Sequence, residues 1–251
     1  MNEGGWPPGY LRRVLDEVDS TNAYAAREAG GVTGPTWIMA RRQTAPRGRR
    51  GRGWVAPEGN FAATLILRPD GPIEQVALRS FVAALALFDA LVAVTGRAEC
   101  FALKWPNDVL LNGGKLAGIL LESAGMGGAV PHVLIGIGVN LKAAPEAAEV
   151  EAGAVRPVAL LSQTGVAVDQ ETFLEHLAAA YAAREQAFVT YGFAPVREAW
   201  LARAARLGEV ITARTGRSEV TGTFETVDEA GRLVLKTRDG RQAIPAADVF
   251  F

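Results

Sequence analysis

The sequence contains very little cysteine and histidine. Cys100 is the only cysteine among 251 residues, and His132 and His176 are the only histidines. One cysteine excludes an internal disulfide framework and a zinc site built from several cysteines, and it is typical of a cytoplasmic protein. Because Cys100 lies far from both histidines in the sequence, neither a histidine-based catalytic triad nor a His/Cys metal site is supported.

The sequence also lacks a recognisable targeting segment. Residues 1–8 contain no basic stretch followed by an apolar one, so no signal peptide is visible. The longest apolar run, Val76 to Val94, is interrupted by Arg79, Ser80 and Asp89. These polar side chains favour a buried helix over a membrane span.

A strong net charge is missing as well. The formal net charge is -1 and the sequence pI is near 6.2, which argues against a general nucleic-acid coat protein. No Gly-x-x-x-x-Gly-Lys-Ser/Thr loop occurs, and no Gly-x-Gly-x-x-Gly stands between a strand and a helix, so a P-loop nucleotidase is not indicated. With 49% hydrophobic residues, the chain can bury one large core, with room for a small second domain.

The most unusual stretch that is present is residues 41–54, an arginine- and glycine-rich loop between two apolar strands at 36–40 and 61–67. Glycine lets successive backbone N–H groups converge on an anion, and arginine pairs with phosphate or carboxylate through two parallel hydrogen bonds. The composition therefore favours a loop that closes over a polyanionic ligand. A solvated surface loop and a nucleic-acid contact are the alternatives.

Three other polar features stand out. The quartet 19–22 (Asp-Ser-Thr-Asn) lies between a strand and a helix, where Ser20 or Asn22 is a natural N-cap or a ligand contact. Lys115 opens an otherwise apolar strand, so it either points to solvent or needs an anionic partner. Glycines inside strands permit close approach of a ligand or of the packed chain, and they occur at Gly118, Gly136 and Gly138.

The hydrophobic pattern predicts an α+β fold with a mixed, largely antiparallel sheet packed by helices. Expected strands cover 12–18, 36–40, 61–67 and 101–105, with an antiparallel meander at 109–111, 115–122 and 133–141. Expected helices cover 23–29, 73–94, 172–189 and 195–206, with a helical turn at 158–164, a hairpin turn at 112–114, a turn at 126–128 and a loop or short helix at 143–154. From Gly208 onward, short strands at 210–215, 219–226, 233–237 and 242–244 predict a small barrel-like domain. The expected domains are 1–206 and 207–251.

Four ordered segments together resemble the biotin protein ligase family. They are residues 19–22; 43–54; 104–108 with 115–119; and 136–140 (Gly-Ile-Gly-Val-Asn). The similarity runs from about residue 10 to the end of the chain. It implies a class II synthetase-like catalytic domain followed by an SH3-like barrel, and the monofunctional type without an N-terminal DNA-binding domain.

By this resemblance, the chain activates biotin with ATP and Mg²⁺ as biotinyl-5′-adenylate and transfers it to a lysine of a biotin carboxyl-carrier domain. The catalytic residues implied are Arg49 and Lys115. The biotin-binding residues implied are Ser20, Thr21, Asn22, Gln43, Arg47, Gly48, Arg49, Lys115 and Gly118. Those implied for ATP or adenylate are Arg49, Arg50, Trp54, Lys104, Asn107, Asp108, Lys115 and Asn140, with Asp108 beside the metal.

One position departs from the family pattern, because Pro46 stands where a glycine usually opens the loop. Proline removes one N–H and fixes φ, so the anion-binding loop is one donor short and its hinge is stiffer. Two alternatives to biotin ligation are a lipoate or octanoate ligase or transferase, and a non-catalytic anion- or RNA-binding module. The sequence leaves open whether acetyl-CoA, propionyl-CoA or pyruvate carboxylase supplies the carrier, and whether the chain is a monomer or a homodimer. It implies no nucleic-acid or membrane partner.

Overall fold

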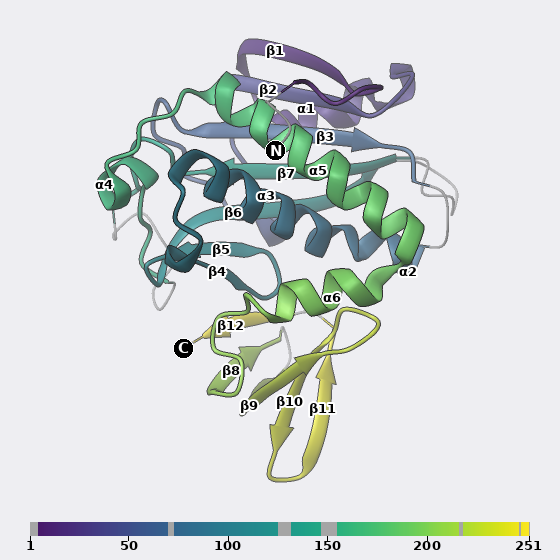
Figure 1. The fold of residues 1–251 in the computed structure, drawn as a ribbon, viewed down its shortest axis with the longest axis vertical. Coiled ribbons are helices and arrows are strands. Elements are labelled where there is room, and N and C mark those ends of the chain that lie inside the picture. The colour runs from purple at the N-terminus through teal and green to yellow at the C-terminus, as the bar shows by residue number, and fades with distance from the viewer. Residues whose placement is uncertain are drawn as a thin grey trace.

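A seven-stranded sheet forms the body of the protein (Figure 1). The computed structural model describes residues 5–69, 73–124, 132–146, 155–215, 218–245 and 247–250. The strand order is β1-β2-β3-β7-β6-β5-β4. In that order the strands are Leu11–Val18, Thr36–Gln43, Phe61–Leu67, His132–Val139, Gly114–Ala124, Asp108–Leu111 and Phe101–Lys104. The pair β1–β2 is parallel and the other neighbouring pairs are antiparallel, which confirms the mixed, largely antiparallel sheet and its meander β5-β6-β7.

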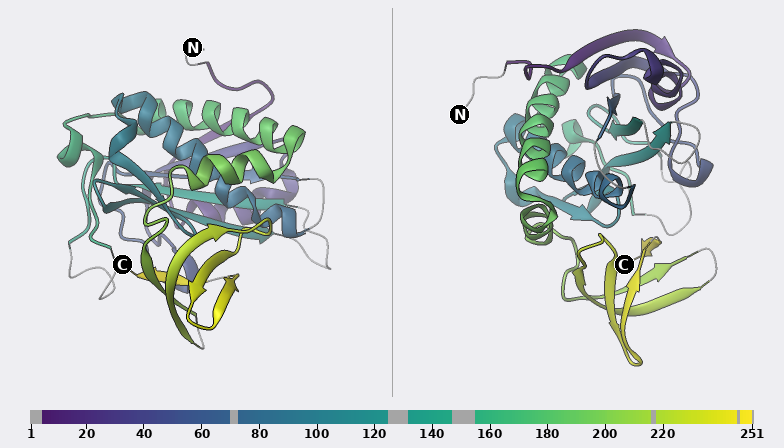
Figure 2. Two further views of the ribbon diagram at one scale, coloured as in Figure 1. Left: turned by 60° about the horizontal axis from the view of Figure 1, so that its bottom comes forward. Right: turned by 90° about the vertical axis from the view of Figure 1, so that its right-hand side faces the viewer.

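One face of this sheet is covered by α3 (Arg79–Thr95), α5 (Gln170–Tyr191) and α6 (Phe193–Leu201), which form a layer along one side of the molecule (Figure 2). The short helix α1 (Thr21–Glu28) packs on β3 and β7 through a separate apolar cluster that includes Ile66 and Leu134. Strand β3 is consequently buried on both faces, which is why its sequence is almost continuously apolar.

Both ends of α5 and the C-terminal end of α3 carry recognisable capping signals. Asp169 caps α5 by accepting hydrogen bonds from the backbone N–H groups of Glu171 and Thr172, and Gly192 ends the helix. Gly96 ends α3 with a left-handed backbone, φ 70°. Among the described residues, one segment, Gln75–Thr95, is long and apolar enough to cross a membrane. However, 72% of its most apolar window is buried inside the protein, as expected for a core helix.

Several predicted boundaries were wrong. The expected helix 73–94 is interrupted at Leu78, which separates α2 (Ile73–Ala77) from α3. The expected helix 195–206 ends at Leu201, and Arg206 adopts a positive φ of 63° that no right-handed helix contains. The helical turn at 158–164 is α4 (Leu160–Thr164), residues 143–146 form neither helix nor strand, and residues 126–128 and 147–154 lie outside the described residues.

The C-terminal residues form a second, five-stranded antiparallel sheet below the β4 edge of the first (Figure 1). Its strand order is β11-β10-β9-β8-β12, and in chain order from β8 its strands are Val210–Arg214, Glu219–Val227, Leu233–Thr237, Gly240–Ile244 and Asp248–Phe250. Within the described residues no pairing closes β11 onto β12, so this part of the expected barrel is an open sheet. The sequence did not predict β12.

The two sheets are joined by direct contacts. The indole N–H of Trp105 donates to the carbonyl of Gly231 at 3.1 Å, and Arg197 of α6 donates to the carbonyl of Val227. A short parallel bridge pairs Leu103 with Ala204. These contacts hold β12 beside the loop that follows β2, and this placement brings the C-terminal sheet into the candidate site.

Candidate functional site

The arginine/glycine loop folds back on itself after β2. The N–H of Trp54 donates to the carbonyl of Pro46 at 3.1 Å, and the N–H of Gly48 donates to the carbonyl of Arg52 at 2.7 Å. A 3-10 turn over 49–51 closes the tip, where Gly51 takes a φ of 73° that favours glycine. Pro46 thus contributes a carbonyl acceptor to the loop closure, and its missing N–H breaks none of these bonds.

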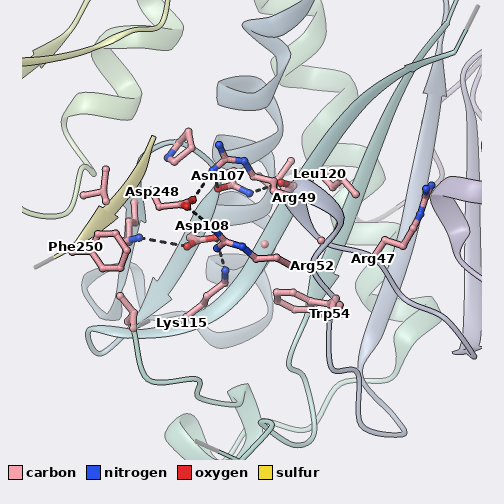
Figure 3. Close-up of a pocket in the computed structure, with 18 residues that line it drawn as sticks. Arg47, Arg49, Arg52, Trp54, Asn107, Asp108, Lys115, Leu120, Asp248 and Phe250 are labelled. Carbon is pink, nitrogen blue, oxygen red and sulfur yellow. Dashed lines mark hydrogen bonds and ion pairs between the residues drawn. The ribbon is translucent and has the colours of Figure 1, made fainter. Parts of the chain in front are cut away.

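A cavity opens between this loop, strands β5 and β6, and β12 (Figure 3). We call it the cationic cavity, because five of its lining side chains are positively charged and two are carboxylates. The charged residues are Arg47, Arg49, Arg52, Lys104 and Lys115, with Asp108 and Asp248. Pro106, Asn107, Trp54, Gly118 and Phe250 also line it. Such an excess of cations favours an anionic ligand.

Two lysines in the cationic cavity share one carboxylate. Lys115 Nζ lies 2.8 Å from Asp108 Oδ1, and Lys104 Nζ lies 3.7 Å from Asp108 Oδ2. Lys104 is 8% exposed, and its burial lowers its pKa while the neighbouring Asp108 partly offsets that effect. An anionic ligand in this cavity would stabilise both ammonium groups.

The C-terminal sheet supplies the second carboxylate of the cavity. Asp248 Oδ2 lies 2.6 Å from an Arg52 guanidinium nitrogen, and Asp248 Oδ1 lies 3.8 Å from Arg49. Arg49 also donates to Asn107 Oδ1 at 3.2 Å. The loop arginines are therefore held from two sides, by β12 and by the turn that follows β4.

A second, smaller cavity adjoins the first, and we call it the narrow cavity. It is lined by Ser20, Thr21, Asn22, Gln43, Arg47, Trp54, Ala62, Leu120, Gly136, Ile137 and Gly138. The Thr21 N–H and hydroxyl donate to Gln43 Oε1 at 2.8 and 3.2 Å, which ties the start of α1 to the end of β2. Ser20 occupies the N-cap position of α1, but its side chain makes no capping hydrogen bond, so the capping alternative is wrong for its hydroxyl.

The Asn22 amide in the narrow cavity is fixed from both ends. Thr64, which is fully buried in β3, donates to Asn22 Oδ1 at 2.6 Å. Asn22 Nδ2 donates to Glu122 Oε2 at 2.8 Å. A Cβ added to Gly136 would lie 2.0 Å from Asn22 Oδ1, so only glycine leaves room for this amide.

Trp54 separates the two cavities and lines both. Its ring packs against Gly118 and Gly138, whose added Cβ atoms would lie 3.1 and 3.0 Å from ring atoms. Lys115 Nζ lies 5.4 Å from the centroid of the ring, on the side of the cationic cavity (Figure 3). The strand glycines therefore leave room for the Trp54 ring and the Asn22 amide, which border the cavities. Close packing against a helix does not by itself explain them.

The structure brings most of the predicted site residues to these cavities, with two exceptions. Asn140 lines neither cavity, because it is buried and its amide contacts Asn60 and the carbonyl of Val158. Only the backbone of Arg50 is described. Sequence reasoning missed Arg52 and Asp248, and it also missed Thr64 and Glu122, which lie behind the narrow cavity. Thr64 could have been found as the one polar residue within β3, and Glu122 as the charge that ends the apolar run of β6.

Two family models match the chain. The model described as "Biotin/lipoate A/B protein ligase family" matches residues 14–140, and the model described as "Biotin protein ligase C terminal domain" matches residues 207–251. The first match begins within β1 and contains the arginine/glycine loop and strands β2 to β7. The second begins after α6 and contains all five strands of the C-terminal sheet.

Curated relatives and solved structures agree with these matches. A biotin–[acetyl-CoA-carboxylase] ligase of Paracoccus denitrificans is 59% identical over 238 residues, which are 95% of this chain and 99% of that protein. The bifunctional ligase/repressor BirA of Bacillus subtilis is 32% identical over 94% of this chain and 73% of its own length. The structure of a biotin protein ligase from Aquifex aeolicus in complex with biotin and ATP superposes with a TM-score of 0.82 at 26% identity, covering 95% of this chain and 97% of that one.

Proposed function

The chain belongs to the biotin/lipoate A/B protein ligase family, and we infer that it is a biotin–[biotin carboxyl-carrier protein] ligase. The observation that carries this function is its 59% identity, over nearly the whole of both chains, to a biotin–[acetyl-CoA-carboxylase] ligase. The enzyme activates biotin with ATP as biotinyl-5′-AMP and then transfers biotin to a lysine of a carrier domain. Two adjoining cavities of different chemistry are what such a two-substrate reaction requires.

The narrow cavity is the proposed biotin site. Biotin carries a ureido ring with one carbonyl acceptor and two N–H donors, and a valerate chain that ends in a carboxylate. Hydroxyl and amide groups of Ser20, Thr21 and Asn22 offer donors and acceptors to the ring, with Gln43 beside them. Leu120 and Ile137 supply an apolar surface for the thioether ring and chain. Gly118 and Gly48 leave room beside Trp54 and the loop.

The cationic cavity is the proposed site of ATP and of the adenylate. In the first step, a carboxylate oxygen of biotin forms a bond to the α-phosphorus, the bond between the α-phosphorus and the α,β-bridging oxygen breaks, and pyrophosphate leaves. Negative charge on the phosphate oxygens is stabilised by fixed cations, for which Arg49 and Lys115 are positioned by Asn107 and Asp108. The same two cations lower the repulsion between the carboxylate and the phosphate, so we assign them the catalytic role.

The second step transfers biotin to the carrier. The neutral amine of the carrier lysine forms an amide bond to the biotinyl carbonyl carbon, AMP leaves with the electrons of the broken anhydride bond, and the proton lost by the new amide nitrogen passes to water. Because AMP departs as a phosphate anion, the Arg49 and Lys115 charges that served the first step also serve this one.

Mg²⁺ belongs to this reaction as the companion of ATP. Among the described residues, no group of three or more acidic, histidine or cysteine side chains is placed to hold a metal. An ion that enters on the phosphates needs only one or two protein oxygens, and Asp108 in the cationic cavity fits that requirement. When bound there, Mg²⁺ neutralises phosphate charge and stabilises the leaving pyrophosphate.

We also propose a domain division, a cellular location and a class of carrier protein. A catalytic domain over 1–206 and a C-terminal domain over 207–251 are supported by the family match that begins at residue 207. A cytoplasmic location is supported by the single cysteine and by the need for ATP. Acetyl-CoA carboxylase is the carrier source named for the relative at 59% identity, and we propose the same class here.

The deciding experiment is biotin-dependent exchange of labelled pyrophosphate into ATP, with octanoate and lipoate in parallel reactions. Exchange with biotin alone, followed by labelling of a carrier domain, is the expected result. Exchange only with octanoate or lipoate would instead identify the chain as a lipoate or octanoate ligase. Absence of exchange with all three acids, from folded protein with Mg²⁺ present, would overturn the adenylation mechanism.

A further inference from the structure

Glu122 connects the narrow cavity to the arginine/glycine loop through a single oxygen. Its Oε2 accepts from Asn22 Nδ2 at 2.8 Å and lies 3.3 Å from an Arg47 guanidinium nitrogen. Glu122 lies near the end of β6, opposite Leu134 of β7, and it lines neither cavity. Its two partners, Asn22 and Arg47, do line the narrow cavity, so Glu122 can influence the cavity only through them.

The carboxylate of Glu122 fixes the orientation of the Asn22 amide, with Nδ2 toward Glu122. An ionised carboxylate only accepts hydrogen bonds, so it selects the Nδ2 end of the amide. The Thr64 hydroxyl donates to the other end, Oδ1, and the amide lies directly against Gly136, where any larger residue would displace it. The remaining N–H and lone pair of Asn22 are thereby presented in one orientation to whatever occupies the narrow cavity.

The contact with Arg47 has a different consequence. The Arg47 and Glu122 side chains are 46% and 35% exposed, and a pair this exposed contributes little to the stability of the fold. Arg47 nevertheless lines both cavities, and its backbone pairs with Gly53 across the loop. Restraining its guanidinium therefore restrains one side of the loop beside the narrow cavity.

We propose that Glu122 is a positioning residue for the biotin half of the site, where it orients the Asn22 amide and anchors Arg47 at the same oxygen. The proposal rests on the biotin ligase function given above. It assigns to Glu122 a larger effect on biotin than on ATP, because Asn22 lines only the narrow cavity of the two, whereas Arg47 lines both. The two roles are separable, since an amide at position 122 can still accept from Asn22 but cannot pair with a guanidinium as an anion.

The test compares Glu122→Gln and Glu122→Ala in pyrophosphate exchange, with separate KM values for biotin and ATP, and measures biotin binding by calorimetry. Loss of the charged contact and of the amide orientation in Glu122→Ala should raise the KM and Kd for biotin about tenfold or more. Glu122→Gln should give a smaller rise with little change in Tm, while the KM for ATP rises less than the KM for biotin in both variants. Glu28→Gln is the matched control, because Glu28 pairs with Arg13 at 2.7 Å at an exposed position away from both cavities.

A double-mutant cycle completes the test. Combining Glu122→Gln with Arg47→Met should cost less than the sum of the single effects on biotin affinity, because both remove the same contact. Unchanged biotin affinity in Glu122→Ala, or equal losses for biotin and ATP together with a fall in Tm, would overturn the positioning role. Failure of the wild-type protein to exchange pyrophosphate with biotin would instead overturn the proposed function, so the two failures are distinguishable.

Discussion

The indole of Trp54 lies against Gly138, with its Nε1 and Cε2 atoms 3.0 Å from the place that a Cβ would occupy. Trp54 belongs to the loop after β2 and Gly138 to strand β7, so the contact joins the loop to the centre of the sheet. Because Trp54 borders both cavities, this one contact sets the wall between the proposed biotin and adenylate sites.

Gly138→Ala should displace Trp54 by a few tenths of an ångström and weaken the binding of both substrates. We expect the KM values for biotin and ATP to rise together, each by about tenfold, with a loss of about 1–3 kcal/mol in the free energy of unfolding from overpacking. Steady-state pyrophosphate exchange and denaturant titration measure these effects. Gly30→Ala is the control, since nothing lies within 4 Å of its Cβ position. Wild-type kinetics for Gly138→Ala would show that the position of Trp54 does not matter.

Lys115→Met should reduce adenylation severely. A charge-assisted hydrogen bond to phosphate contributes about 1.5–3 kcal/mol, so kcat/KM for exchange should fall about ten- to hundredfold or more. Asp108 keeps Lys104 as a partner in this variant, so the protein should still fold. Lys236→Met, at an exposed position of β10, provides the comparison. A fall of less than threefold would remove Lys115 from the catalytic role.

Asp248→Asn tests whether the C-terminal sheet contributes to the site. Without its charge, the restraint on Arg52 at 2.6 Å and on Arg49 at 3.8 Å is weakened, so the KM for ATP should rise about tenfold by loss of charged hydrogen bonds. The KM for biotin should rise less, because Asp248 lines only the cationic cavity of the two. Asp239→Asn, in the exposed turn between β10 and β11, should leave both values unchanged. Equal effects of the two substitutions would exclude a specific contribution of β12.

Lys104→Met should stabilise the fold and weaken ATP binding. Burial is the main cause that lowers the pKa of Lys104, so holding its charge in the folded protein costs free energy. The folded state therefore binds fewer protons than the unfolded state between the lowered pKa and 10.5, and this residue makes stability rise with pH in that window. Methionine removes that rise, leaves Asp108 paired with Lys115, and should raise Tm by a few degrees near neutral pH. Thermal unfolding across pH 7–10, alongside the KM for ATP, checks both effects, and a lower Tm would contradict the prediction.

Much of the fold could be predicted from local patterns. The apolar run of β3 and the Asn-Gly turn at 112–113 before β6 have local physical causes and were predicted from them. The helix expected at 172–189 is α5, within a few residues at each end. The strand that was missed depends on a distant contact. Strand β12 is three residues long, and its pairing with β8 is what makes it a strand.

The sequence by itself determined which chemistry the protein carries. The arginines and glycines of the loop, the lysines at 104 and 115 and the polar quartet at 19–22 are residue types that bind anions and amides wherever they converge. Their order along the chain was enough to indicate the family.

Only the tertiary structure decided which of these groups line each cavity and which side chains hold them in place. Antiparallel pairing of β6 and β7 places Gly118 opposite Gly138, which lets Trp54 settle between two cavities. Packing of α1 on the sheet brings Asn22 to Glu122, 100 positions later, and the C-terminal sheet brings Asp248 to Arg52, 196 positions earlier. Such pairings depend on the register and packing of distant segments, and no local periodicity encodes a contact between them.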